Sequence, residues 1–81
     1  MMQAPKPWTH WTNKGTFKIV PVMLGGSPHC ELWLNDTRLG TYSYVFTASA
    51  SISNGEHDQT LGFEASKLGV PESAADWNGF K

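Results

Sequence analysis

Two short turn signals divide the middle of this chain into three strand-like runs. The first is the cluster at residues 25–28, where two Gly precede Ser and Pro, residue types that break regular structure. The second is Asn35-Asp36, a pair that tolerates the backbone of a two-residue hairpin loop. β-Branched and aromatic side chains are typical of the runs around them, residues 16–23, 29–34 and 37–42. Strands joined by such short loops pair with each other, so we predict a three-stranded antiparallel meander.

Pro21 lies inside the first of these runs and has no N–H to donate to a sheet. We therefore expect this strand to lie at a sheet edge or to bulge at Pro21. An edge of that kind leaves backbone groups free to pair with another chain. Self-association is therefore one expected mode of interaction.

The residues after Tyr42 fit both a strand and a helix. Apolar residues alternate with Ser and Thr as far as Ile52, which is a strand pattern, yet Val45, Ala48 and Ile52 recur at helical spacing. A strand continuing from residue 37 to 53 would far exceed the usual length of roughly 3–10 residues. Helix is therefore the favoured interpretation. Its expected N-cap is Ser43 and its expected end is Asn54-Gly55.

Shorter helical segments are expected towards the C-terminus. Asp58 is placed to cap a helix whose apolar positions are Leu61, Ala65 and Leu68, with Gly69 as its end. A last helical turn is expected from residues 71–73 to about Asp76. Trp77 and Phe80 follow, and we expect them to dock against the core.

These elements predict an α+β domain in which a three-stranded antiparallel sheet packs against one main helix. Leu, Ile, Val and Phe together make up 16 of the 81 residues, so the core must also draw on the ten aromatic side chains. Each of these can bury roughly 150–250 Å². Residues 1–7 contain two Pro and predict a flexible N-terminal arm, and residues 8–81 predict a single domain.

Composition also bounds the compartment and the partners. No apolar run approaches the roughly 20 residues of a membrane helix, and residues 1–7 lack a signal-peptide pattern. The single cysteine contrasts with the several disulfides of small secreted domains. We therefore expect a cytoplasmic protein with no membrane partner. The formal net charge is −1, and without a basic cluster nucleic acid is a disfavoured partner.

The candidate chemical groups are His29-Cys30 and the Glu-His-Asp run at residues 56–58. Structural zinc sites have paired ligand spacings that are missing here, and adjacent strand residues point to opposite faces. We therefore predict no metal, no cofactor and no catalytic residue. A thiol- or metal-dependent enzyme acting through Cys30 and His57 is the third-ranked interpretation. Glu31 beside Cys30 weighs against it, because a reactive thiolate needs nearby cations or a helix N-terminus.

Aromatic residues and one arginine supply the candidate binding residues. They are Trp8, Trp11, Trp33, Arg38 and Trp77. Trp and Arg often anchor protein interfaces, and exposed Trp also stacks on single-stranded bases. The alternative is that the tryptophans near the two ends of the chain hold the termini against a thin core. The leading hypothesis is a small non-catalytic protein-interaction or regulatory module, whose partner is an unknown protein or a second copy.

The run Leu-Gly-Thr-Tyr-Ser at residues 39–43 leads from a strand into an Ala-rich segment. It resembles the corresponding step in sheet-plus-helix DNA-binding domains of the plant AP2 and integrase arm-binding types. The resemblance covers about residues 15–53 and implies three strands, a helix, and a sheet face that meets DNA. On that face it implies Lys18, Trp33 and Arg38, with Glu31 among them. The alternative function is therefore a nucleic-acid-binding module using the sheet face.

The whole chain, including residues 68–71 and 76–78, also resembles small bacterial proteins of unknown function. That resemblance implies a stand-alone domain and assigns no functional residue.

Overall fold

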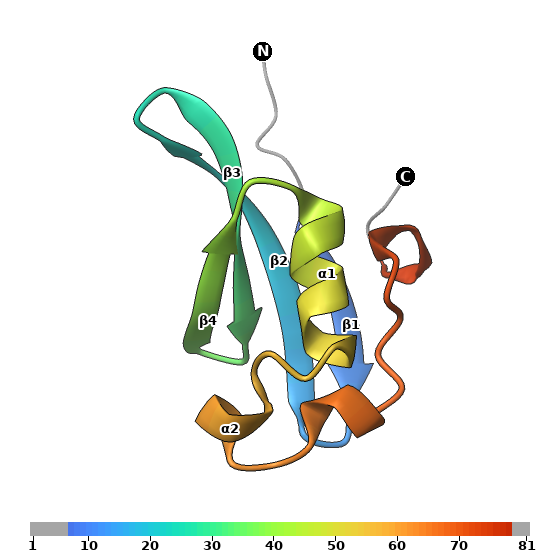
Figure 1. Ribbon diagram of the computed structural model, residues 1–81. Coiled ribbons are helices and arrows are strands. Elements are labelled where there is room, and N and C mark those ends of the chain that lie inside the picture. Colours follow the sequence, from blue (N-terminus) through green and yellow to red (C-terminus); the bar gives the residue numbers. More distant parts are fainter. Residues whose placement is uncertain (1–6, 79–81) are drawn as a thin grey trace.

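The computed structural model describes residues 7–78, over which the chain forms an antiparallel sheet and one main helix (Figure 1). The sheet has four strands in the order β1-β2-β3-β4. The strands are β1 (Trp8–Thr12), β2 (Gly15–Leu24), β3 (Ser27–Leu34) and β4 (Thr37–Tyr42). The helical elements are α1 (Val45–Ser53), α2 (Asp58–Leu61) and two short 3₁₀ turns, η1 (Ala65–Lys67) and η2 (Ala74–Asp76). The predicted α+β class is confirmed.

The predicted meander is confirmed for β2, β3 and β4, but the predicted number of strands is wrong. β1 adds a fourth strand, paired with β2 from Trp8↔Ile19 to Thr12↔Gly15. A strand of five residues is too short to stand out in the sequence, and it forms because β2 offers a long edge to pair with. Of the predicted N-terminal arm, Pro7 alone lies within the described residues.

Helix α1 lies across one face of the sheet (Figure 1). The predicted helical spacing is correct, because Ala48 and Ile52 are fully buried against the sheet residues Phe17, Ile19 and Leu32. The predicted N-cap is wrong: Tyr44 occupies that position, and no side chain caps the helix. Asn54 and Gly55 end α1 as expected, with the left-handed backbone at Gly55 (φ 87°).

The helix predicted over residues 58–68 is interrupted. Gly62 adopts a left-handed backbone with φ 79° and ends α2 after one turn. Asp58 is the first residue of α2 rather than its cap, and its carboxylate accepts hydrogen bonds from the N–H and hydroxyl of Ser66 at 2.9 and 2.6 Å. These bonds fold the chain back into η1.

The predicted last turn is confirmed as η2, where the Ser73 hydroxyl accepts a hydrogen bond from Ala75 N–H at 3.2 Å. Trp77 docks as expected and is 3% exposed. Next to it, Asn78 and Thr9 exchange two backbone hydrogen bonds of 2.9 Å, which close the outer edge of β1 at that point. Phe80 lies outside the described residues.

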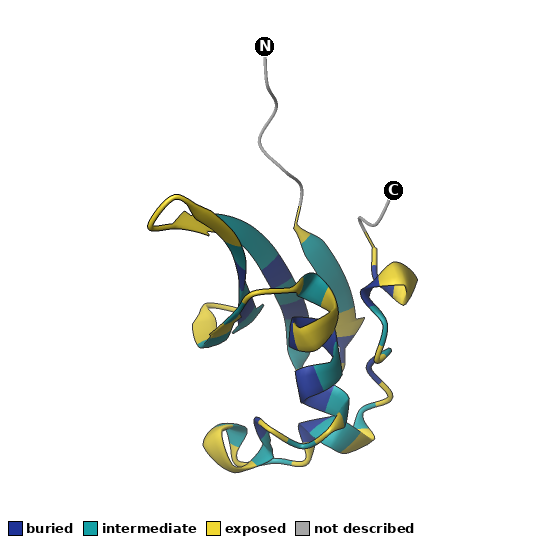
Figure 2. Ribbon diagram, turned by 45° about the horizontal axis from the view of Figure 1, so that its top comes forward, coloured by how far each residue is buried: buried dark blue, intermediate teal, exposed yellow. Residues whose placement is uncertain are grey.

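The sheet has two unlike faces. The face covered by α1 and the C-terminal segment, here called the helix face, carries the buried core residues Phe17, Ile19, Cys30, Leu32 and Leu34. Figure 2 shows the buried residues concentrated where α1 meets the strands, with exposed residues at the tip of the β2–β3 hairpin. Alternate strand residues point to the other side. This side, here called the open face, carries Trp11, Thr16, Lys18, Val20, Glu31, Trp33, Arg38 and Thr41.

Asn35 ties the β1–β2 and β3–β4 hairpins together. Its N–H donates to Thr16 O, and its side-chain oxygen accepts from Thr16 N–H, both at 3.0 Å. Gly15 has φ 132°, and a Cβ there would collide with the Asn35 side chain. The contact therefore requires glycine at residue 15.

We expect Gly15→Ala to lower the free energy of unfolding by about 2–3 kcal/mol, because it combines a strained backbone with that collision. Gly26→Ala is the matched control, because Gly26 also has a positive φ but open space around it. It should cost about 1 kcal/mol. Urea denaturation of both variants measures the difference, and equal losses would contradict the role assigned to Asn35.

Candidate functional site

A cation–aromatic–cation row crosses the open face. Lys18 on β2 is paired with Trp33 on β3, and Trp33 is paired with Arg38 on β4. Because paired residues of adjacent strands point to the same side of a sheet, the three side chains lie next to one another. The structure thus brings together the three side chains that the sequence analysis placed on one sheet face.

Glu31 lies beside the row and contacts two of its members. Its carboxylate oxygens accept hydrogen bonds from the Trp33 indole N–H and from the Arg38 guanidinium, each at 3.3 Å. The Arg38 side chain is 58% exposed, whereas that of Glu31 is 18% exposed. Glu31 therefore fixes the orientation of Trp33 and of Arg38, while Arg38 keeps most of its surface available to a partner.

A β-bulge directly follows the Trp33–Arg38 pair and determines which way the rest of β4 faces. The register between β3 and β4 shifts at Leu32/Trp33, so that Leu32 faces Gly40 and Trp33 faces Arg38. Leu39 is the extra residue and packs against the core. The bulge thus shifts the alternation in the rest of β4, so that Thr41 pairs with Glu31 on the open face and Tyr42 pairs with Cys30 on the helix face.

A shallow hollow of about 410 Å³ adjoins the row. It is lined by Thr16, Lys18, Asn35 and Asp36. Trp11 is the strand partner of Thr16 and is 71% exposed. The open face thus offers two tryptophans on strands on either side of Lys18, with an indentation at the Asn35 end.

The other two predicted binding residues, Trp8 and Trp77, lie on the helix face. The Trp77 indole N–H donates to Pro71 O at 3.0 Å, and its ring packs against His10 at 5.9 Å between centroids. Trp8 is partly buried against the core. These positions match the alternative role of holding the two ends of the chain on the core, and they separate both residues from Trp11, Trp33 and Arg38.

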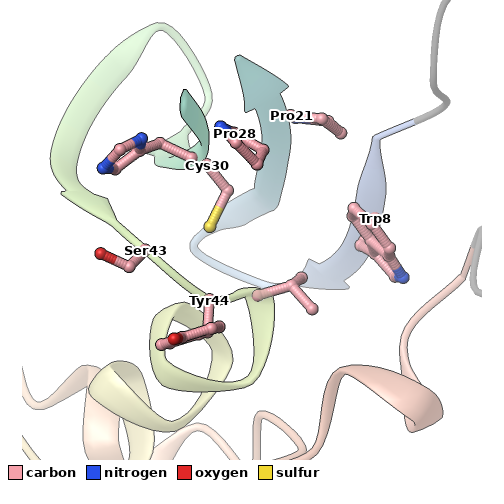
Figure 3. A pocket seen from close by; sticks show the side chains of 8 residues that line it. Trp8, Pro21, Pro28, Cys30, Ser43 and Tyr44 are labelled. Atoms are coloured by element: carbon pink, nitrogen blue, oxygen red, sulfur yellow. The ribbon is translucent and has the colours of Figure 1, made fainter. Parts of the chain in front are cut away.

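A second hollow, of about 250 Å³, lies on the helix face at the base of the β2–β3 hairpin (Figure 3). Its lining residues are Trp8, Pro21, Pro28, His29, Cys30, Ser43, Tyr44 and Val45. Figure 3 shows the Cys30 sulfur pointing towards the start of α1. Among residues 7–78, none of the side chains that line the hollow is a carboxylate, a lysine or an arginine.

Cys30 and His57, the third-ranked candidates, are both buried. Cys30 is 4% exposed, and its Sγ lies 3.5 Å from Tyr42 O. Burial raises the pKa of its thiol, which disfavours the reactive thiolate. Within residues 7–78 no three His, Cys, Asp or Glu side chains are grouped as metal ligands.

His57 belongs to a polar cluster that sequence reasoning missed. Its Nε2 lies 2.8 Å from the Tyr42 hydroxyl and 3.0 Å from the Ser51 hydroxyl. Ser51 donates its own proton to Ala48 O at 2.7 Å, and Tyr42 donates to Glu56 at 3.2 Å. Both oxygens can then accept from an Nε2–H. Ser51 is 1% exposed, so this Ser–His pair holds the end of α1 in place and offers no accessible nucleophile.

Comparison with protein-family models, curated proteins and solved structures finds no match to this chain. What the structure itself defines is an α+β domain with one covered and one open sheet face. None of the helices formed by residues 7–78 has the length and apolar character needed to cross a membrane.

The buried imidazole gives a prediction for stability against pH. Burial lowers the pKa of His57, and the nearby Glu56 and Asp58 offset this only in part. The unfolded chain therefore takes up a proton near pH 6.5 while the folded chain stays neutral, so stability should fall as pH drops below about 6.5. In the variant His57→Gln, the side-chain amide can donate a hydrogen bond in place of the imidazole N–H but does not take up a proton in this pH range. Urea denaturation at about pH 7.5 and about pH 5 should show a smaller acid loss in this variant, and equal losses would exclude His57 as the cause.

Proposed function

We propose that this chain is a small non-catalytic interaction module that binds a protein partner through the open face of its sheet. The observation that carries the proposal is the one-sided fold: α1 and the C-terminal segment lie on one face, while the other presents Trp11, Trp33 and Arg38. No element formed by residues 7–78 covers the open face, and a sheet face with large exposed side chains is a surface at which a partner can bury area.

The chemistry of the open face favours a protein over a polyanion. Its two cations, Lys18 and Arg38, are accompanied by the carboxylate of Glu31, which already contacts Arg38. Tryptophan and arginine are enriched among the few side chains that contribute most of the binding energy at protein interfaces. The partly exposed Arg38 guanidinium also suits a carboxylate on the partner.

Affinity capture from a lysate of the source cell, with and without nuclease, tests this. We expect a protein partner that survives nuclease and is lost on Trp11→Ala, because removing an interface tryptophan costs about 2 kcal/mol or more, over tenfold in affinity. Phe46→Ala is the control, since Phe46 is an exposed aromatic residue on α1. A partner that binds the wild type and Trp11→Ala equally would refute the open face as the binding surface.

The Lys18–Trp33–Arg38 row favours one second candidate, a module that binds single-stranded nucleic acid. An aromatic ring between two cations can stack a base while the cations meet phosphates. The net charge of −1 limits this candidate, because phosphate neutralisation supplies most of the affinity.

Fluorescence anisotropy with a labelled single-stranded oligonucleotide tests the second candidate. If the row binds it, affinity should fall steeply as salt rises, and Lys18→Ala should reduce the slope by about 1. Lys67→Ala, on η1, is the control. Absence of binding at low salt, or a salt slope unchanged in Lys18→Ala, would remove this candidate.

A further inference from the structure

The β2–β3 hairpin extends beyond both of its neighbours. β1 pairs with β2 only as far as Ile19, and β4 pairs with β3 only as far as Cys30. The remainder, residues 20–29, projects from the body of the domain as a two-stranded arm (Figure 1). Its tip is a Gly25-Gly26 turn with φ 57° and 83°, and Met23 beside it is 66% exposed.

Proline blunts both outer edges of this arm. Thr9 directs its backbone N–H and C=O away from β2, towards Asn78. Along an antiparallel ladder the backbone groups of successive residues point to alternate sides. Ile19 therefore directs its N–H and C=O towards β1. Residue 21 directs its backbone to the same side, where β1 has already ended. The same alternation directs position 28 outwards, beyond the end of β4. Pro21 and Pro28 therefore remove donors from the outer edges and from nothing else, which protects the arm against strand pairing.

With these two outward donors missing, the arm offers a partner mainly its side chains. On the side of the helix face it carries Pro21, Met23 and Pro28, with Cys30 directly at its base. The 250 Å³ hollow lies at the base of this same side, with Tyr44 at its rim, 74% exposed. A protruding apolar tip and an apolar hollow therefore lie at opposite ends of one surface of the arm.

The character of this surface indicates what fills the hollow. Residues 19–30 and 39–55, which supply the arm and most of the hollow, contain no Asp, Glu, Lys or Arg. The centres of protein interfaces are depleted of charge and enriched in aromatic residues and Met. A volume of about 250 Å³ is below the roughly 300–1,000 Å³ of small-molecule sites, and it suits one or two apolar side chains such as those of the arm tip.

We propose that two copies of this chain associate about a two-fold axis, with the arms antiparallel and each Met23 packed in the hollow of the other copy. Such a contact is self-complementary, as a two-fold interface requires. One arm tip and one hollow from each copy should bury much less than the roughly 1,600 Å² of a standard interface. The dimer is therefore reversible and dissociates on dilution. The proposal does not depend on the open face.

Sedimentation velocity of the full chain over a dilution series tests the proposal. Wild type should shift from monomer to dimer as concentration rises. Met23→Glu should raise the dissociation constant more than about tenfold, because a carboxylate would be buried without a partner. Leu24→Glu is the matched control, since Leu24 is also exposed but points to the opposite side of the arm, and it should dimerise as wild type does.

A second matched pair tests the hollow. Tyr44→Glu, at its rim, should abolish the dimer, and Phe46→Glu, on α1 outside the hollow, should leave it intact. Circular dichroism establishes that each variant is folded. The proposal is overturned if wild type stays monomeric at every concentration, or if folded Met23→Glu or Tyr44→Glu still dimerises as wild type does.

Discussion

The chain has too few apolar side chains outside the sheet to cover both of its faces, and this limits how much of the sheet is buried. A single main helix and a short C-terminal segment pack on the face that carries Phe17, Ile19 and Leu32, and the sequence provides no further apolar element among residues 7–78 for the opposite face. A chain of this length buries only about 60% of its unfolded surface. The open face is therefore a direct consequence of the size of the core, and the exposed side chains on it become available for binding.

The parts of the fold that local chemistry determines could be predicted from the sequence. Turn residues positioned β2, β3 and β4, and the spacing of Val45, Ala48 and Ile52 identified α1. The parts that depend on partners distant in the chain could not. β1 is a strand because β2 is available to pair with it, and the chain after Gly62 turns back into η1 because Ser66 binds the carboxylate of Asp58.

The candidate site shows the same division. Lys18, Trp33 and Arg38 could be placed on one sheet face by alternation, and the two-residue Asn35-Asp36 loop pairs Trp33 with Arg38. The bulge at Leu32/Trp33, which no sequence pattern indicated, determines the faces of the residues that follow it, so that Thr41 lies on the open face and Tyr42 on the helix face. The cluster around His57 could not be predicted from the sequence for a related reason. Tyr42 and Ser51 lie 15 and 6 residues from His57 in the sequence. Their hydroxyl groups come within hydrogen-bond distance of His57 only when the helix packs on the sheet.

The two proposed surfaces have opposite chemistry and lie on opposite sides of the sheet. The open face combines tryptophan with charged side chains. The described residues of the arm and its hollow include no Asp, Glu, Lys or Arg. Charged surfaces increase specificity and association rate, whereas an uncharged apolar contact gains free energy mainly by removing area from water. A dimer joined through the hollows would leave both open faces accessible. A weak contact between copies could then raise the avidity for a partner with two sites through effective concentration, without any new contact on the open face.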